Sequence, residues 1–288
     1  MPAVSVIIPT FNRAKFIGEA LESVLNQRFD DREVIVVDDG SDDATADILR
    51  CYEGEIRVLI QSNRGVSAAR NAGIAIASAE LITFLDSDDL WLPGKLEVQV
   101  DFFRTHLGAL ICQTEEIWVR DGVRVNPKQR HRKPQGDIFE RSLALCLVSP
   151  SAVMMRRTLF DEVGLFDENL PACEDYDLWL RVACRYPVHL IDQPLIIKRG
   201  GHDDQLSRAP GLDRYRITAL NHLLENTPLS NRRFELVRET LLNKCAIYIN
   251  GCRKRGKVGQ ARHYQHLADR WRCATTSADL PQQRPDRI

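Results

Sequence analysis

The sequence lacks three features that would assign it to a membrane-spanning, nucleic-acid-binding or disulfide-bonded class. No apolar run reaches the about 18 residues that a membrane-spanning helix needs, and Met1 to Pro9 carries no charged signal-peptide region. The net charge of −1 at pH 7 argues against nucleic-acid binding by the whole protein. The eight cysteines form no C-x-x-C pair, which favours reduced thiols in a cytosolic protein over disulfides or a zinc site.

Glycine is also missing where a dinucleotide-binding fold needs it. No G-x-G-x-x-G motif follows a strand-like segment, which argues against a Rossmann oxidoreductase. The composition is otherwise ordinary for a globular protein, with 44% hydrophobic and 27% charged residues. The 288 residues fit one large domain, or one domain with an appendage.

The first third of the chain alternates between strand and helix patterns. Apolar runs typical of buried strands are separated by stretches whose apolar side chains recur at helical spacing. This alternation predicts right-handed βαβ units and a mostly parallel sheet, in which ligands bind beyond the carboxyl ends of the strands. The predicted strands cover residues 4–8, 33–38, 56–60 and 81–85, and the predicted helices cover 14–27, the stretch after Ser41, and 66–79.

Three acidic clusters stand in a fixed order along the chain: Asp38-Asp39, Asp86-Ser87-Asp88-Asp89 and Glu174-Asp175. The first two directly follow predicted strands. Carboxylates at strand ends cost folding energy unless something there needs them. The usual need is a divalent cation, a polar ligand or a proton transfer, so the clusters mark candidate functional sites.

The D-x-D pattern of Asp86 and Asp88 suits a divalent cation. Two carboxylates two residues apart on an extended backbone point the same way, and Mg²⁺ and Mn²⁺ prefer such oxygen ligands. Taken alone the pattern is weak, because helix caps and turns also use aspartate.

The pattern is less regular between residues 93 and 208. Residues 126–136 form a polar basic loop, which we interpret as solvated rather than as acceptor-binding. Its cations are Lys128, Arg130, Arg132 and Lys133. Helices are predicted at 93–106 and 176–185, and strands at 109–119 and 151–156.

Beyond about Asp213 the pattern becomes entirely helical and basic. Residues 232–273 contain eleven Lys or Arg and three Asp or Glu, a net charge of +8. Such an appendage could rest on anionic lipid headgroups or present an ordinary solvated face, and both interpretations stay open. Residues 276–288 predict a disordered tail.

Several segments together resemble, in order and rough spacing, the motifs of family 2 glycosyltransferases. The joint match is highly specific and covers residues 4 to about 208, whereas no such motif covers the helical remainder. The segments are residues 4–12 with 36–43, which resemble the N-terminal signature, then 63–73, the D-x-D motif at 84–89 and the E-D motif at 174–181.

The resemblance implies an α/β fold of the GT-A type, a Rossmann-like, mostly parallel sheet flanked by helices, with a C-terminal helical appendage. By position in the motifs, Pro9, Thr10 and Phe11 would hold the base and ribose of a nucleotide sugar. Asp39 would be the acid that contacts the nucleoside, and Asp38 would support its loop.

The resemblance also implies two basic residues at the donor site. Arg64 and Arg70 would flank the nucleotide, with Arg70 as a charge partner of Asp39. Asp86 and Ser87 would complete the nucleotide-sugar contacts, Asp86 reaching either the ribose or the metal.

The metal and the chemistry would come from three further residues. Asp88 corresponds to the principal ligand of Mn²⁺ or Mg²⁺, and His202, in a loop with two glycines, would reach the metal or the diphosphate. Asp175 corresponds to the catalytic base that takes the proton of the acceptor hydroxyl. A divalent cation would neutralise the leaving diphosphate, and attack opposite to it would invert the anomeric carbon in one step.

The sequence therefore predicts an inverting, metal-dependent glycosyltransferase that moves a sugar from a nucleotide sugar, a UDP-sugar first, to a saccharide or lipid-linked acceptor. The family's commonest context implies cell-envelope polysaccharide synthesis in the cytoplasm, with peripheral contact at the inner face of the cell membrane through the basic helices. The predicted domains are a GT-A domain at 1–208, with a nucleotide-binding half at 1–92 and an acceptor-binding half at 93–208, and a helical extension at 209–275.

Two other functions stay open. A non-catalytic GT-A-like protein that only binds nucleotide sugars would be favoured by loss of Asp88 or Asp175, and both are present. A sugar nucleotidyltransferase would need a glycine-rich loop directly after the first strand to cradle a triphosphate. The segment from Pro9 to Asn12 has no glycine, which argues against that activity.

Overall fold

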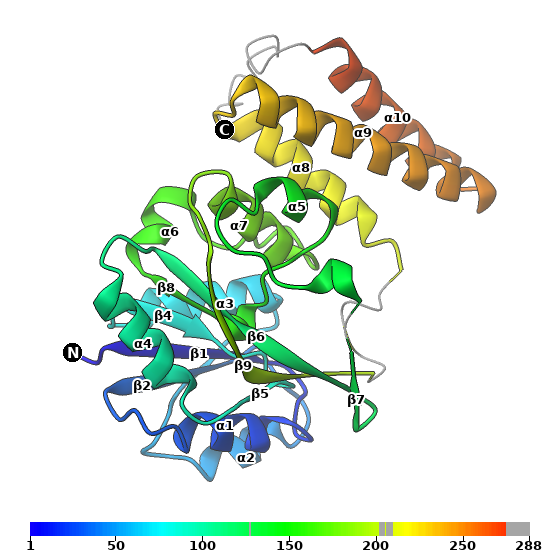
Figure 1. Ribbon diagram of the computed structural model, residues 1–288. Coiled ribbons are helices and arrows are strands. Elements are labelled where there is room, and N and C mark those ends of the chain that lie inside the picture. Colours follow the sequence, from blue (N-terminus) through cyan, green and yellow to red (C-terminus); the bar gives the residue numbers. More distant parts are fainter. Residues whose placement is uncertain (127, 202–204, 206–209, 275–288) are drawn as a thin grey trace, which may run out of the picture. The chain divides into compact units, whose positions relative to one another are not determined.

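The structure is a computed structural model that describes residues 1–126, 128–201, 205 and 210–274. The chain divides into two compact units, Met1–Arg208 and Ala209–Ile288. The first unit is a sheet with helices on both faces, and the second unit is helical where it is described (Figure 1). The predicted α/β class with a helical C-terminal region is therefore confirmed.

Nine strands among the described residues form one sheet in the first unit, in the order β3-β2-β1-β4-β8-β6-β9-β5, with β7 beside β6. The four N-terminal strands are mutually parallel, as the strand–helix alternation predicts. Beyond β4 the sheet is mixed, because β8 is antiparallel to both β4 and β6 whereas β9 is parallel to β6. The strands are β1 (Val4–Thr10), β2 (Arg32–Asp38), β3 (Arg57–Ile60), β4 (Leu81–Phe84), β5 (Leu90–Trp91), β6 (Ile111–Arg120), β7 (Val123–Val125), β8 (Val153–Arg156) and β9 (His189–Gly200).

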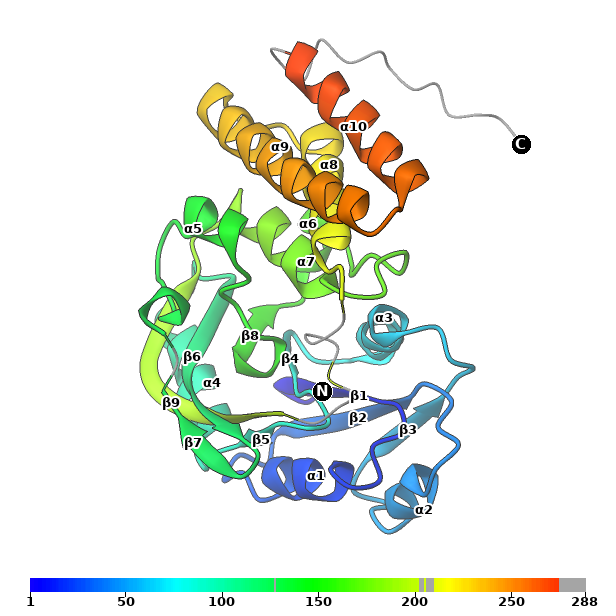
Figure 2. The ribbon, with the colours of Figure 1, turned by 90° about the vertical axis from the view of Figure 1, so that its right-hand side faces the viewer.

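Helices cover the two faces of the parallel strands (Figure 2). Alternate residues of β1, Val4, Val6 and Ile8, share one core with apolar side chains of α1 and α4, because successive side chains of a strand point to opposite faces. The other face is covered by α3, which packs on β1 and β2, and by α6, whose Phe160 packs edge-on against Phe84 of β4. The helices of this unit are α1 (Ile17–Leu25), α2 (Thr45–Arg50), α3 (Val66–Ile76), α4 (Lys95–Thr105), α5 (Phe139–Ala144), α6 (Thr158–Val163) and α7 (Glu174–Ala183), with 3₁₀ turns at Gln129–His131 and Pro150–Ala152.

Helix α3 lies very close to β1. A Cβ atom added at Gly73 would lie 2.5 Å from Cγ2 of Ile7, so only glycine fits at this crossing. This close approach fixes the position of α3, which carries Arg70, against the strands whose carboxyl ends bear the acidic residues.

The parallel strands deliver the predicted site residues to one edge of the sheet. Strand β1 ends at Thr10, its neighbour β2 ends at Asp38, and β4 on its other side ends just before the Asp86 turn. The carboxyl ends of neighbouring parallel strands meet at the same edge, so these segments form one surface, as predicted.

The second unit packs three helices, α8 (Asp213–Asn226), α9 (Asn231–Lys254) and α10 (Val258–Cys273). The fully buried Trp271 of α10 packs edge-on against Phe234 of α9 and donates its indole N–H to Asn221 Oδ1 at 2.8 Å. Among the described helices of either unit, none combines the length and the apolarity needed to span a bilayer.

Candidate active site

The carboxylate of Asp39 organises the loop that follows β3. Its Oδ1 accepts hydrogen bonds from Gln61 Nε2 at 2.7 Å and from the backbone N–H of Arg64 at 2.9 Å. Its Oδ2 accepts one from the backbone N–H of Gly65 at 2.7 Å. A carboxylate offers about four acceptor positions, so these three bonds leave Asp39 one position on Oδ2 for a ligand donor.

The end of β1 lies beside this loop. The Thr10 carbonyl accepts the backbone N–H of Asp39 at 2.9 Å, and the side chain of Phe11 is 42% exposed. Asp38 accepts the backbone N–H of Ser41 at 3.0 Å, so it holds its own loop. The end of β1 at Pro9 and Thr10 is thus bonded to the loop of Asp39, and Phe11, the next residue, has an exposed side chain.

The predicted ion pair between Arg70 and Asp39 is wrong. Arg70 instead pairs with Asp86 at 2.6 Å and with Glu174 at 2.7 Å. The reason is geometric: backbone N–H groups and Gln61 already hold Asp39, and α3 presents Arg70 to the end of β4 and the start of α7. Burial alone would lower the pKa of Arg70, but the charges of Asp86 and Glu174 raise it, so the guanidinium stays charged.

The contacts of Arg64 and Ser87 are with the protein itself. The Arg64 backbone holds Asp39, while its exposed guanidinium pairs with Glu168 at 2.6 Å. Ser87 is buried between Asp86 and Asp88 in the turn after β4.

Replacing Arg70 with methionine should lower the free energy of unfolding by about 3 kcal/mol, because Glu174 would stay buried without a cation. Urea denaturation of the whole chain measures the change. Arg104→Met is the matched control, since Arg104 forms only an exposed pair with Asp101 and should cost less than about 0.5 kcal/mol. Equal losses in the two variants would show that the buried pair does not stabilise the site.

The three carboxylates of the turn after β4 differ in burial. Asp89 is buried, and its Oδ1 accepts the backbone N–H of Arg199 at 2.9 Å while its Oδ2 accepts the hydroxyl of Ser151 at 2.7 Å. Burial and the charge of Asp88 raise the pKa of Asp89 well above its usual range. The same Ser151 hydroxyl accepts the backbone N–H of Asp86 at 3.1 Å. Asp89 therefore fixes the turn, and the half-buried Asp86 and Asp88 are its accessible carboxylates.

The donor set of this turn fits a divalent cation that arrives with a phosphate ligand. Among the described residues, no three His, Cys, Asp or Glu side chains are grouped so as to enclose a metal ion. Mg²⁺ and Mn²⁺ are commonly bound by one or two carboxylates, with substrate phosphates and water completing the shell. Asp86 and Asp88 are such a pair. His202, the other predicted ligand, lies outside the described residues.

The first turn of α7 holds the E-D pair in two different environments. Glu174 is buried against Arg70. Asp175 is half-buried, its Oδ1 accepting the backbone N–H of Tyr176 at 2.7 Å and its Oδ2 lying 3.4 Å from the thiol of Cys146. Burial and the charge of Asp175 raise the pKa of Cys146, so the thiol stays protonated and donates. The two neighbouring acids therefore have separate partners, and only Asp175 borders a cavity.

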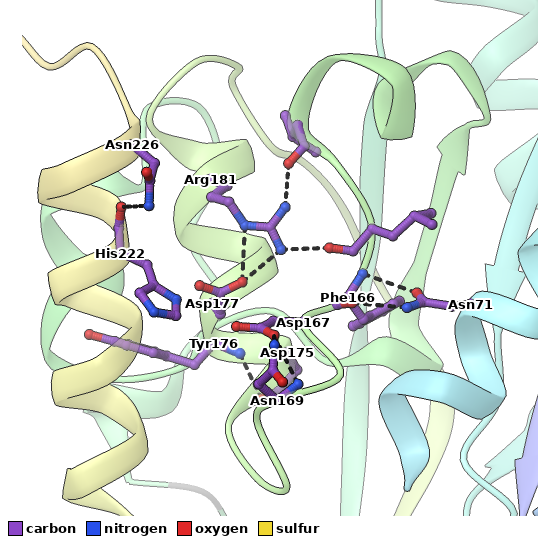
Figure 3. A network of polar contacts seen from close by, with 12 residues as sticks. Asn71, Phe166, Asp167, Asn169, Asp175, Tyr176, Asp177, Arg181, His222 and Asn226 are labelled. Carbon is purple, nitrogen blue, oxygen red and sulfur yellow. Dashed lines mark hydrogen bonds and ion pairs between the residues drawn. The ribbon is translucent and has the colours of Figure 1, made fainter. Parts of the chain in front are cut away.

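The segment before α7 is fixed from both sides (Figure 3). The Asn71 side chain bonds both backbone groups of Phe166, accepting its N–H at 3.1 Å and donating to its carbonyl at 2.9 Å. Arg181 donates to the Leu165 carbonyl at 2.8 Å and pairs with Asp177 at 2.7 Å. These bonds position the start of α7 and hence Asp175.

A cavity of about 490 Å³ opens between β6, β9 and the segment 145–149. Within it Lys133 pairs with Glu116 at 3.2 Å, and the Trp118 indole donates to Glu116 at 2.7 Å. Burial would raise the pKa of Glu116, but the ammonium groups of Lys133 and Lys198 lower it to about 2. Residues around the cavity include Glu116, Trp118, Lys133, Cys146, Asp175 and Lys198.

The basic loop is only partly solvated, which corrects one prediction. Lys128, Arg130 and Arg132 are exposed as expected, but Lys133 is buried because Glu116 of β6 and the Gln113 side chain receive its ammonium. The sequence reasoning also missed Glu116 and Lys198. One feature of the sequence could have pointed to them: each is a charged residue within a strand-like segment, Glu116 within residues 111–120 and Lys198 within residues 189–200.

Comparisons with known proteins agree on one family. The sequence profile of Glycosyl transferase family 2 matches residues 5–164. An uncharacterized glycosyltransferase of Rickettsia typhi is 34% identical over 238 residues, covering 78% of this chain and 69% of that protein. TuaG of Bacillus subtilis, a candidate teichuronic acid biosynthesis glycosyltransferase, is 32% identical over 183 residues, covering 62% of this chain and 71% of TuaG.

Solved structures share the fold. The crystal structure of residues 1–349 of S. aureus TarS in complex with UDP-GlcNAc superposes with a TM-score of 0.70. The two chains are 20% identical, and the match covers 86% of this chain and 81% of the TarS chain. At this identity the similarity is one of fold.

Proposed function

This chain belongs to glycosyl transferase family 2, and from that membership we propose that it is an inverting, metal-dependent transferase that uses a UDP-sugar. The motif resemblance is confirmed, as are the GT-A fold and a glycosyltransferase function. The finer proposal rests on two observations. Asp39 and the Asp86–Asp88 turn follow parallel strands that end at the same edge of the sheet. Arg70 pairs with both Asp86 and Glu174, which links this edge to the start of α7, where Asp175 lies.

The donor nucleoside is proposed to bind between Phe11 and Asp39. The exposed Phe11 ring offers a face on which a base can stack. The remaining acceptor position on Asp39 suits a single N–H or O–H donor, such as the N3–H of uracil or a ribose hydroxyl. The backbone of Pro9 and Thr10 would line the same site. TarS was solved with UDP-GlcNAc, which supports uridine as the first base to test.

The acidic turn is proposed to hold the diphosphate through Mn²⁺ or Mg²⁺. Asp88 would be the principal ligand, with Asp86 and Ser87 beside it, and His202, outside the described residues, would be a further ligand as the motif resemblance implies. When bound, the cation neutralises charge that develops on the leaving diphosphate. Arg70 holds Oδ1 of Asp86 and so fixes the direction of that carboxylate. Arg64, beside Asp39, would add positive charge at the nucleotide.

Asp175 is proposed as the general base. As the acceptor oxygen attacks the anomeric carbon, its proton passes to Asp175 and the bond from that carbon to the diphosphate oxygen breaks. Attack opposite the leaving group inverts the anomeric carbon and needs no second nucleophilic carboxylate. Glu174 cannot take this role while Arg70 holds its carboxylate. The backbone of Tyr176 and the thiol of Cys146 orient Asp175 toward the cavity.

The acceptor is proposed to enter the cavity that Asp175 borders. The cavity presents the Trp118 ring together with the charged groups of Glu116, Lys133 and Lys198, a combination that suits a sugar ring with its hydroxyls. TuaG is named for teichuronic acid biosynthesis, which supports a saccharide or lipid-linked acceptor of the cell envelope. Work on such an acceptor would place the protein in the cytoplasm at the inner face of the membrane.

Release of the nucleoside diphosphate from a panel of UDP-, GDP- and dTDP-sugars, with Mn²⁺ and acceptor mixtures, tests the proposal. We expect one UDP-sugar to be turned over at least about tenfold faster than its GDP and dTDP counterparts. Binding of a nucleotide sugar without any release would favour the non-catalytic binding protein. Formation of a nucleotide sugar from a nucleoside triphosphate would identify a nucleotidyltransferase instead.

A further inference from the structure

The turn between α9 and α10, located in Figure 1, is rich in Lys and Arg. We define the basic turn as residues 253–262, and its residues 253–260 are all exposed. The sequence has no Asp or Glu anywhere from Thr240 to Ala268. The cations of the basic turn are Arg253, Lys254, Arg255, Lys257 and Arg262.

Several other cations of the same helical unit pair with acids. Lys244 pairs with Asp213 at 3.4 Å, and Arg238 and Arg270 each pair with a glutamate at 2.5 Å. By contrast, no cation of the basic turn lies in an ion pair with any acid in the described part of the chain. Arg253 of the basic turn does bond α10, but it donates to a neutral group, Gln265 Oε1, at 3.5 Å, so the charge of the basic turn is not neutralised within the described residues.

Helix electrostatics explain only part of this charge. Arg253 and Lys254 occupy the last turn of α9, where cations interact favourably with the helix dipole. Lys257 is the N-cap of α10, the positive end of that helix, where a cation is unfavourable, and Arg262 lies beyond the first turn. Exposed positive charge without an acidic partner among the described residues indicates an anionic partner outside the chain.

Exposed apolar side chains accompany these cations. Val258, directly after Lys257, is 63% exposed, and Ile247 on α9 is 64% exposed. A bilayer surface accepts both kinds of side chain, since cations attract anionic headgroups and small apolar groups enter the interface. The basic turn itself has no aromatic residue on which a base of single-stranded nucleic acid could stack, and Tyr264, which follows it, packs against Tyr248.

We propose that the basic turn docks on the surface of a membrane that contains anionic phospholipid. This proposal rests on the membrane contact included in the proposed function and specifies the residues that would make it. It does not depend on the transfer chemistry. Docking would keep the protein on the surface where a lipid-linked acceptor lies. It uses headgroup charge and a shallow apolar contact, so the attachment would be peripheral and sensitive to salt.

Co-sedimentation of the full chain with vesicles tests this proposal. We expect binding to phosphatidylcholine vesicles that contain about 30% phosphatidylglycerol, and none to pure phosphatidylcholine. The double variant Lys254→Glu/Lys257→Glu should bind at least about 25-fold more weakly, since each lost cation costs about fivefold. Lys15→Glu/Arg28→Glu, which changes the net charge equally at exposed sites of the first unit, should bind as the unaltered chain does.

Three outcomes overturn the proposal: equal binding to neutral and anionic vesicles, equal binding by the two double variants, or binding to single-stranded oligonucleotides in place of vesicles. Circular dichroism shows whether each variant keeps its helices. Turnover of a water-soluble donor is measured alongside, so that loss of vesicle binding with turnover intact separates this surface from the active site. A chain that binds vesicles but turns over no donor would leave the docking surface standing and remove the proposed activity.

Discussion

Replacing Asp175 with asparagine is expected to lower kcat by about 10³-fold while leaving the affinity for the donor nucleotide within about twofold. Asparagine has nearly the same shape and can still accept the backbone N–H of Tyr176, but it cannot take a proton from the acceptor. The loss should therefore appear in turnover and not in binding. Steady-state kinetics on the UDP-sugar identified by the donor panel, with calorimetric nucleotide binding, measure both quantities.

Two further variants make this prediction specific. Asp161→Asn removes an exposed carboxylate on α6 and should leave kcat unchanged. Glu174→Gln removes the buried partner of Arg70, so it should destabilise the fold more than it impairs the chemistry of the folded fraction. If the Asp175 variant kept more than about a tenth of kcat, another group would have to be the base.

Replacing Asp88 with alanine should reduce turnover by about 10²- to 10³-fold and abolish its response to Mn²⁺. The side chain is the proposed ligand of the cation that neutralises the diphosphate. The backbone of the turn should persist, because Arg199 bonds the Asp88 carbonyl and Asp89 keeps its bonds to Arg199 and Ser151. Turnover across a Mn²⁺ titration, with a chelator as the zero point, measures the effect.

The control for this variant is Asp42→Ala, which removes an exposed carboxylate from the loop after β2. It changes the charge near the donor site by the same amount and should alter turnover by less than about threefold. Mn²⁺-dependent turnover that survived in the Asp88 variant would show that the cation is held elsewhere or is not needed.

The sequence predicted the sheet edge well because burial and periodicity are local properties. The apolar runs predicted the positions of β1, β2 and β4, and therefore also which residues follow the end of each strand. Asp39 and Asp86 lie at those ends because parallel neighbours finish at one edge. Predicting these positions required no knowledge of how the second half of the chain folds.

The partners of the charged residues could not be predicted in the same way. Arg70 is 104 positions before Glu174, and its choice of Asp86 and Glu174 over Asp39 depends on how closely α3 packs on β1. The cavity wall depends on the pairing of β6 with β9, whose register shifts between Thr114 and Glu116. Such a shift changes which side chains face the cavity, and nothing in the local sequence signals it.

Calorimetric titration of UDP into the purified chain, with and without Mn²⁺, is the direct test of a metal-assisted donor site. We expect binding with a dissociation constant on the order of 10 μM that requires Mn²⁺ and disappears in the Asp88→Ala variant. GDP and dTDP should bind more weakly. UDP binding of equal strength with a chelator present, or in the Asp88 variant, would contradict the metal-assisted donor site. Failure of all three nucleotides to bind would contradict the proposed transferase chemistry itself.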